Sequence, residues 1–572
     1  MTLIGGRVTT ISSTPGISDL THTGEGGMMK TDDSVQKTEL MNGSRMDQKT
    51  TQRPTVFRSL FHEIMCVIIL TFAPALNSVT VGGLTIALTA IGKEFNIDGG
   101  VLSWTQSAAA LGTASFLLVM GQISDVLGRK RMLMFAYAMF VIFSIIAGFM
   151  KGAIPFFIFR ALQGVCSATA VTAGAGILGA TYKNSRRKNY AMASFGAGAP
   201  IGFIAGILSS GICLEILTWN AVLFFYAIVY AILTVLALVF VPNDPPLERS
   251  KIMRKFRTLD YGGGALAVCG LTLFVFSLSQ ADAAPEGWNT PYVIALLIVG
   301  VILMITFCFY EAYVPNNPLM PMRIWKFPGF ALSMGIISCG WVDFTGCLNY
   351  YATLYFQDVK GASPILTTAY YVPQAVAGIL VNAFAGYTLH RIPGRILIII
   401  AMTGFTGAAL LWSFVEPNTL YWALPFPAFI LVVIGADLAY NVCNMHALSS
   451  VDRSLQSSAA ATFNTVLQIS TAVGLAASSA IVNSVTPHQD TATPEQLVKG
   501  YHAGYYFALG VAALGLVMSF FLNVGTKGAE AKGDQEGQIK GEEKTNDSTS
   551  CVRGIEVDDD LRAESGDMED QR

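Results

Sequence analysis

Three ionisable side chains stand well inside long apolar stretches of the sequence: Arg160, Asp343 and Asp437. A charge in an apolar interior is costly, so such residues usually face a polar cavity and take part in moving ions or protons. A carboxyl group taken out of water holds a proton more readily than a solvated one, as a proton carrier requires. We therefore predict that these residues couple solute movement to protons.

Each of these predictions has a structural alternative. Either aspartate could hydrogen-bond across a helix interface, and Arg160 follows Lys151 closely enough to extend towards a membrane surface. Nearby amides are candidates to line the same cavity, and Asn441 and Asn444 share one face of a helix. The full set of candidate cavity-lining amides is Asn77, Gln163, Asn349, Asn441 and Asn444.

The sequence gives no indication of a cofactor, a metal or an enzymatic centre. The nine cysteines form no CxxC or Cys/His metal spacing, and the six histidines are scattered, with no His-x-x-x-His pair. A nucleotide-binding loop of the Walker type is also absent from the sequence. We expect no enzymatic activity and an ion gradient, rather than ATP, as the energy source.

Membrane-spanning helices would position these side chains. The 572 residues are 52% hydrophobic and only 13% charged, with a mean hydropathy of +0.51. A spanning helix needs about 20 mostly apolar residues. We count fourteen such stretches, near residues 64–90, 102–122, 132–150, 154–180, 190–212, 219–241, 261–281, 291–312, 329–352, 366–389, 395–414, 420–447, 457–484 and 501–524.

The distribution of basic residues supports this number. With the N-terminus in the cytoplasm, the cytoplasmic loops hold seventeen lysines and arginines and the opposite loops hold four. Twelve spans remain an alternative. If the adjacent stretches 261–281 and 291–312 are both omitted, every later loop stays on the same side of the membrane. The fold expected is an all-α membrane protein with both termini cytoplasmic.

The two ends of the chain differ in character from this apolar body. Residues 1–58 and 527–572 are polar or charged, and we predict disordered cytoplasmic tails. The sequence opens on no secretory signal, so the first apolar stretch would serve as both signal and span. We expect four acids at span ends to be solvated, namely Glu63, Asp260, Asp282 and Glu311.

A loop motif lies between the second and third stretches and comprises Gly121, Asp125, Gly128, Arg129 and Lys130. Gly128 permits a tight turn, and Asp125 at a helix end can pair with the basic cluster. The spacing resembles the signature loop of the major facilitator superfamily, where it acts as a cytoplasmic latch between the two halves. The alternative is that the basic residues only fix the topology.

Two further motifs resemble this family. Arg160, Gln163 and Gly164 match its Arg-x-x-Gln-Gly motif, in which the arginine is linked to proton transfer. The fifth stretch is similar to the antiporter motif through Gly198, Pro200, Gly202 and Gly206. It departs from that motif because Ala199 precedes the proline and the usual Gly-Gly pair is split. The glycines would allow close helix packing, and the motif implies export.

The motifs and fourteen spans together resemble the fourteen-span drug:proton antiporter family in a fungal version. The resemblance implies two six-helix bundles, residues 59–242 and 329–526, with linkers and an inserted helix pair over 243–328. It also implies a monomer in the lipid bilayer that handles protons and a small-molecule substrate, without nucleic acid. A degenerate second latch runs from Gly386 to Arg395, with His390 in the acid's position.

Two departures indicate a side branch. Asn77 stands where many members carry a first-span aspartate, and the stretch at Trp219 lacks the usual arginine. These features resemble the fungal aminotriazole-resistance, boron-efflux and low-affinity ammonium transporters. We predict proton-coupled efflux of a drug, toxin or metabolite at the plasma membrane, with the vacuolar membrane as the alternative. Uptake of a small polar solute such as ammonium or borate is the second hypothesis, and a non-transporting sensor is the third.

Overall fold

The computed structural model is all-helical over the residues that it describes, with no strand among them. The described residues are 54, 56–97, 99–182, 186–244, 256, 259–281, 284, 287–315, 318–388, 391–452, 455–486 and 492–523. The predicted C-terminal tail lies outside this set, as do His390, Asp282 and the predicted N-terminal tail apart from residues 54 and 56–58. Fourteen helices in the described part are long and apolar enough to cross a membrane, which confirms fourteen over twelve.

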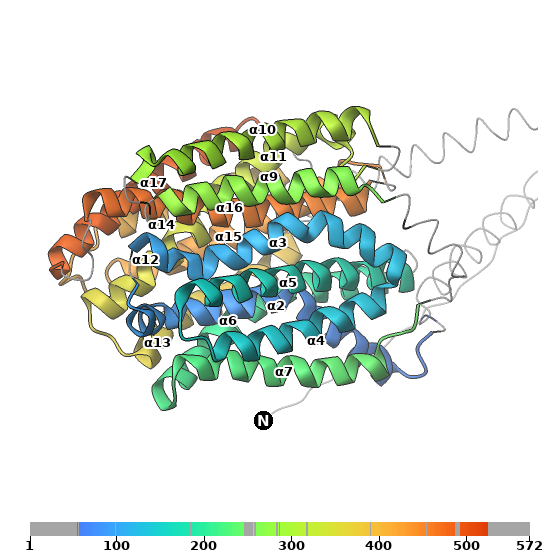
Figure 1. Ribbon diagram of the computed structural model, residues 1–572, viewed down its shortest axis with the longest axis horizontal. Coiled ribbons are helices and arrows are strands. Elements are labelled where there is room, and N and C mark those ends of the chain that lie inside the picture. The colour runs from blue at the N-terminus through green and yellow to red at the C-terminus, as the bar shows by residue number, and fades with distance from the viewer. Residues whose placement is uncertain are drawn as a thin grey trace, which may run out of the picture.

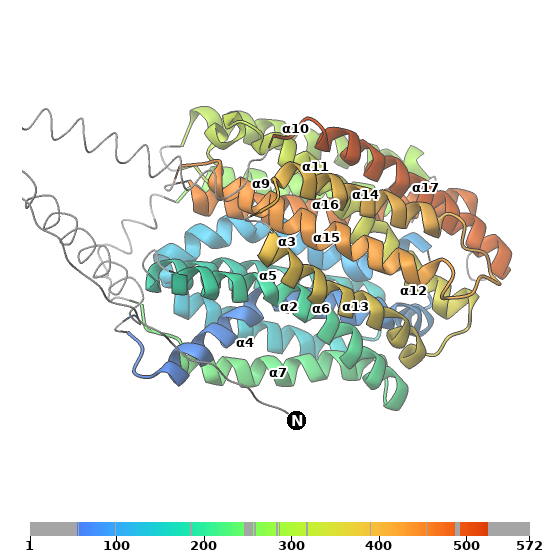
Figure 2. The same cartoon turned by 180° about the vertical axis from the view of Figure 1, so that it is seen from behind.

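The first six helices form one bundle. They are α2 (Leu60–Phe95), α3 (Gly99–Leu127), α4 (Arg129–Gly148), α5 (Ala153–Thr181), α6 (Arg186–Ile216) and α7 (Trp219–Phe240). α2 packs along α6, α3 along α5, and α4 between α5 and α7. In both views these helices run side by side, with α7 at the outer edge (Figure 1) (Figure 2).

The last six spans form the second bundle. The first of them runs from Phe330 to Val359 and combines α11 (Phe330–Asp343), the π-helix η4 (Phe344–Leu348), α12 (Asn349–Leu354) and the π-helix η5 (Tyr355–Val359). The others are α13 (Pro364–Thr388), α14 (Gly394–Trp412), α15 (Pro425–Ser449), α16 (Gln456–Val485) and α17 (Pro494–Ser519). The two bundles meet where α3 packs against α16 and α6 against α13.

An inserted helix pair joins the bundles in sequence. It consists of α9 (Tyr261–Gln280) and α10 (Pro291–Tyr313), with the short 3-10 helices η2 (Gly287–Asn289) and η3 (Met322–Lys326) after each. α9 packs against α3 of the first bundle and α16 of the second, and α10 packs on α9. α10 lies at the edge of the molecule opposite α7 (Figure 1) and is the least buried of the fourteen spans.

Side-chain caps explain several helix ends that the apolar pattern missed. Ser59 accepts a hydrogen bond from the His62 amide and starts α2 four residues before the predicted stretch. Thr493 and Gln496 form a reciprocal capping box, so α17 begins at Pro494 instead of near residue 501. These first turns are therefore helical although polar residues interrupt the apolar pattern there.

The acids at span ends correct one expectation, because those described are buried rather than solvated. Glu63 is 6% exposed, and its carboxylate accepts from the Tyr182 hydroxyl and pairs with Arg187 at 2.9 Å. Glu311 is 4% exposed and accepts from the Met320 amide, and its other oxygen faces Asp260 beside Gly263. These acids tie helix ends together, which explains why they tolerate burial.

Candidate functional site

A cavity of about 560 Å³ lies between the two bundles. Its walls come from α2, α3, α5 and α6 on one side and from α11, η4, α13, α15 and α16 on the other. Three lining residues near the end where α6 begins and α13 ends are exposed: Met192, Ala193 and Gly386. Among the described lining residues, the cavity is thus open at the end where α6 begins. At the other end Ile207 and Thr368 are buried, although the neighbouring Leu208 and Val372 are exposed on the outer flank.

Contacts between the bundles close the opposite end. The Gln357 side chain on η5 donates to the Ile86 carbonyl oxygen of α2 at 2.9 Å and is hydrogen-bonded to the Thr89 hydroxyl. The Thr368 hydroxyl on α13 donates to the Ile207 carbonyl of α6 at 3.4 Å. These bonds join helices of different bundles, so opening this end requires that they break.

Asp437, in the middle of α15, is the only charged side chain among the described residues that line the cavity. It is partly exposed to the cavity, and the Asn382 amide lies beside its carboxyl group. A Cβ atom on Gly378 would lie 3.3 Å from Asp437 Oδ2, so the glycine leaves space beside this oxygen. The carboxyl group is thus accessible from the cavity.

Seven amides and several aromatic rings make up most of the remaining polar and planar lining. Asn77, Asn441 and Asn444 line the cavity, together with Gln374, Asn382, Asn464 and Gln468. The rings of Trp341 and Tyr440 lie 5.9 Å apart, and those of Phe203 and Phe344 lie 6.2 Å apart across the two bundles. The lining is therefore neutral and aromatic apart from one carboxyl group.

Two predicted cavity-lining amides, Gln163 and Asn349, do not line the cavity. Gln163 accepts from Arg160 and donates to the Ser144 hydroxyl, inside the first bundle. Asn349 donates to the Phe344 carbonyl across the π-helix η4 and accepts from Gln374, which itself lines the cavity. Both amides form hydrogen bonds with buried groups behind the residues that line the cavity.

Arg160 and Asp343 also lie behind the wall instead of in it. Arg160 is fully buried on α5, where Nε donates to the Thr105 carbonyl at 3.1 Å and another nitrogen donates to Gln163 at 2.6 Å. Asp343 is fully buried at the end of α11, and neither carboxyl oxygen has a hydrogen-bond partner in the described part of the chain. It immediately precedes η4, and π-helical turns inside α-helices are frequent at functional sites.

The glycines of the fifth-span motif hold α6 close to α2. A Cβ atom on Gly198 or Gly206 would overlap the carbonyl oxygen of Thr71 or Val79, and one on Gly202 would lie 2.8 Å from Ala75. Pro200, between them, lines the cavity. The motif therefore sets how closely one cavity wall packs on its neighbour.

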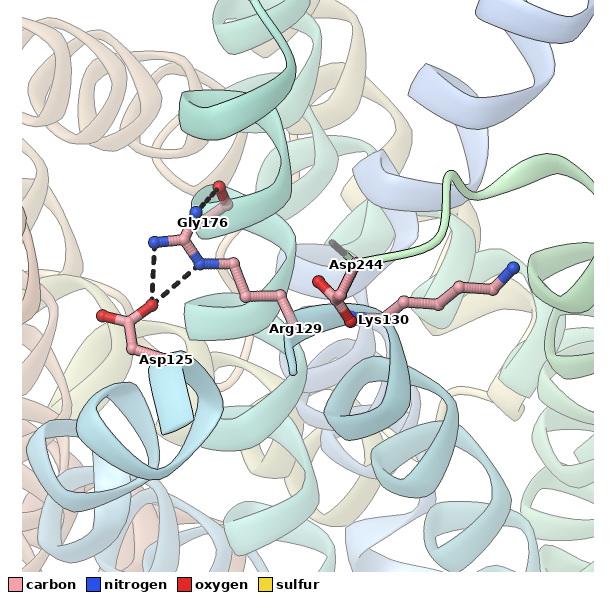
Figure 3. Close-up of polar contacts among 5 residues, drawn as sticks. All are labelled: Asp125, Arg129, Lys130, Gly176 and Asp244. Carbon is pink, nitrogen blue, oxygen red and sulfur yellow. Dashed lines mark hydrogen bonds and ion pairs between the residues drawn. The ribbon is translucent and has the colours of Figure 1, made fainter. Parts of the chain in front are cut away.

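Residues of the signature loop make polar contacts with α5 and lie beside Asp244, which follows α7 (Figure 3). Arg129 pairs with Asp125 at 2.8 Å and donates to the Gly176 carbonyl of α5. Gly128 adopts a φ of 103°, a conformation that glycine takes without strain, and Gly121 packs on Thr172.

Lys130 and Asp244 add a contact that the sequence did not indicate. Asp244, just after α7, accepts from the Lys130 backbone amide at 3.0 Å, while Lys130 Nζ donates to the Leu238 and Val241 carbonyls. Each helix thus satisfies free backbone groups at the end of the other. Among the described residues, all these loop contacts stay within the first bundle.

Some cavity residues that the sequence interpretation missed follow a helical period. Gln374, Gly378, Asn382 and Gly386 recur every four residues along α13, and Asn464, Gln468 and Thr471 follow one face of α16. A search for polar or small residues at this spacing within apolar stretches would have found them. A search for single charges does not.

Comparisons with known proteins agree with this geometry. The sequence model of the Major Facilitator Superfamily matches residues 70–475. The chain is 30% identical to the low affinity ammonium transporter of Saccharomyces cerevisiae over 81% of this chain and 88% of that one. It is 27% identical to efflux pump terJ of Aspergillus terreus, over 81% and 88%, and 26% identical to the aminotriazole resistance protein of Saccharomyces cerevisiae, over 82% and 85%.

Solved structures show the same fold at low sequence identity. The nucleoside transporter NupG aligns with a TM-score of 0.52 and 13% identity, over 80% of this chain and 98% of that one. The human organic anion transporter MFSD10 aligns with a TM-score of 0.52 and 12% identity, over 80% and 99%. The resemblance drawn from the sequence motifs is confirmed, the fold is that of a transporter of small solutes and not of an enzyme, and the chain belongs to the major facilitator superfamily.

Proposed function

We propose that this chain exports small molecules in exchange for protons by alternating access of the central cavity. The observation that carries the proposal is the position of Asp437, the only charged side chain of the described lining, in the cavity between the two bundles. A single accessible carboxyl group in a cavity that opens to one side at a time can bind a proton on one side and release it on the other.

The basic loops favour an orientation with both termini in the cytoplasm, and we propose the plasma membrane as the location. In that orientation the cavity opens to the cytoplasm, because the exposed lining residues Met192 and Gly386 lie at that end. This is the side from which an exporter loads. Residues 59–242 and 329–526 would move as units, with 243–328 as the linker and inserted pair.

The other motif residues would support this movement from outside the cavity. Arg160 and Asp343 are buried groups within one bundle each, so we propose that they exchange protons only in another state of the cycle. The loop containing Asp125, Arg129 and Lys130 would keep the cytoplasmic end of the first bundle rigid. The glycines of α6 would let it tilt along α2.

Purified protein in lipid vesicles tests the proposal. With an acidic vesicle interior, labelled aminotriazole should accumulate above the level of protein-free vesicles, because inward probe movement is exchanged for outward protons. Asp437→Asn should reduce accumulation to that background, since an amide cannot titrate. Asp452→Asn is the matched control, because this exposed aspartate pairs only with Arg323 among the described residues. Undiminished accumulation by Asp437→Asn would refute the assignment.

A second candidate is uptake or facilitated movement of a small polar solute. The observation in its favour is that the ammonium transporter relative aligns over most of its length and that Asn77, which cannot titrate, lines the cavity. Labelled methylammonium distinguishes the two. Uptake that follows its own concentration gradient, with no response to an imposed pH gradient, would favour this candidate.

A further inference from the structure

A second cavity, of about 470 Å³, lies within the second bundle at the end where α13 and α15 begin. Its walls come from η5, from the first ten residues of α13, from the segment between α14 and α15, and from the start of α15. The described residues that line it include none that line the central cavity. The proposed exchange function therefore leaves the second cavity without a role.

The second cavity lies where the spanning helices end. Trp422, in the segment just before α15, lines it and is 71% exposed, and tryptophan is enriched at the boundary between a bilayer and water. On α13 the lining residues Tyr370 and Pro373 lie within about 14 Å of the first residue of the helix, at 1.5 Å per residue. The second cavity is thus at the level of the lipid head groups.

Aromatic rings form much of the wall. The rings of Tyr370 and Tyr421 stack with their centroids 4.5 Å apart, and those of Phe356 and Trp422 lie 4.7 Å from Tyr370 and 5.2 Å from Tyr421. The Tyr421 hydroxyl donates to the Tyr370 carbonyl and so is engaged within the wall. Clustered ring faces attract quaternary ammonium groups, as in aromatic cages.

Lys360 is the only charged side chain among the described residues that line the second cavity. Its Nζ donates to the Thr419 carbonyl at 2.8 Å, which uses one of three ammonium protons, and none of the ion pairs among the described residues involves it. Glu416 contacts the lining residue Tyr355 through its backbone carbonyl and is not itself a lining residue. An anionic group beside Lys360 would therefore meet a cation that has no acidic partner.

An apolar stripe continues from the second cavity along the outside of α13. Ala369, Pro373, Val376 and Leu380 are spaced at i, i+4, i+7 and i+11, so they share one face of the helix. The first two line the second cavity, and the last two are exposed. In a bilayer this stripe offers a path for an acyl chain whose head group lies at the end of the helix.

We infer that the second cavity binds the head group of a phosphatidylcholine, with the phosphate at Lys360, the trimethylammonium group against the aromatic rings, and an acyl chain along α13. A ligand with only a negative charge would leave the ring faces without a cation. A ligand with only a positive charge would be repelled by Lys360. A zwitterionic head group satisfies both parts of the wall, and the apolar stripe favours a lipid over a dissolved solute.

Native mass spectrometry of the purified full-length protein in detergent tests this inference. Dioleoyl phosphatidylcholine should bind at one tight site, about tenfold or more tighter than dioleoylglycerol, which lacks the head group. Dioleoyl phosphatidic acid, which lacks the ammonium group, should bind about three- to thirtyfold more weakly than phosphatidylcholine. Dissolved phosphocholine, which lacks the chains, should not displace the lipid at the same concentration.

Three variants place the binding at the second cavity. Lys360→Met should weaken phosphatidylcholine binding about tenfold, because the charged hydrogen bond to the phosphate is lost, whereas Lys360→Arg should keep it. Trp422→Ala should weaken it about three- to thirtyfold. Lys499→Met is the matched control, since this exposed lysine lies in the first turns of α17 at the same end and does not line the second cavity.

Several outcomes would overturn the inference. Equal phosphatidylcholine binding by Lys360→Met and the wild type, with a lower melting temperature of the variant in lipid-free detergent, would mean that Lys360 only fastens the segment at Thr419. If Lys360→Met does not fold, the wild-type series decides. Tighter binding of phosphatidic acid than of phosphatidylcholine would refute the aromatic subsite, and phosphocholine that competes as well as the lipid would refute a lipid site.

Discussion

Asp343 is a buried carboxyl group with no hydrogen-bond partner among the described residues, and such a group lowers the stability of the folded protein. Replacement by an apolar residue of similar size removes the unsatisfied oxygens. We therefore expect Asp343→Leu to raise the melting temperature in detergent by a few degrees, corresponding to about 1–3 kcal/mol. Proton-driven transport should be lost in the same variant.

A fluorescence-based thermal shift and the vesicle assay check the two parts of this prediction. Asp343→Asn is the control, since it keeps the unsatisfied polar group and should not gain stability. If Asp343→Leu is more stable and transports normally, Asp343 has no part in coupling. A loss of stability would show that the carboxyl group makes stabilising contacts in the purified protein.

The cavity residues were only partly predictable. Asp437, Asn441 and Asn444 were found because polar residues are rare in a spanning stretch and share a helix face. Asn349 was misplaced for a physical reason. The π-helical turn Phe344–Leu348 contains more residues per turn than an α-helix, so it rotates the following residues away from the face that a 3.6-residue period assigns to them.

Among the helices, the contact between α2 and α6 depends on residues without side chains. A Cβ atom on Gly206 would overlap the Val79 carbonyl oxygen, which belongs to the backbone and cannot rotate away. Gly206→Ala should therefore separate the two helices and cost about 1–3 kcal/mol of stability. The melting temperature of the purified variant measures this.

Gly196→Ala is the matched control on the same helix, because no atom lies within 4 Å of the Cβ that it would add. We expect this change to be neutral or slightly stabilising, since alanine favours a helix more than glycine does. Equal melting temperatures for the two variants would show that α2 and α6 are further apart in the purified protein than in this structure.

For the molecule as a whole, the closed end of the cavity determines which side has access. A Cβ atom on Gly211 would lie 2.8 Å from the Thr368 Cβ, so the two positions are close enough for a disulfide after a small shift. In a variant with the nine native cysteines replaced, Gly211→Cys with Thr368→Cys should cross-link on oxidation and stop transport. Reduction should restore it.

Each single-cysteine variant is the control for this experiment, and oxidation should leave its transport rate unchanged. The electrophoretic mobility of the oxidised double variant, before and after reduction, reports whether the bond has formed. Normal transport by a fully cross-linked protein would mean that α6 and α13 do not separate at this end during the cycle.

The overall architecture was largely predictable from the chain. The charges of the loops indicated an even number of spans, and the motif around Asp125 indicated the fold family. The position of the inserted pair was not predictable, because the apolar surface of α9 can pack on any helix that offers small or apolar residues. Its contacts with α3 and α16 depend on the three-dimensional shape of both bundles.

The location of α9 makes the two long sides of the transporter unequal. It packs against both α3 and α16, where these two helices of different bundles meet. The other contact between the bundles, between α6 and α13, is different. There Leu208 and Val372 line the cavity and are each 41% exposed. Hydrocarbon chains of the bilayer would touch these residues directly. A lipophilic compound dissolved among the acyl chains would thus meet cavity-lining residues at this flank without first passing through the aqueous opening of the cavity.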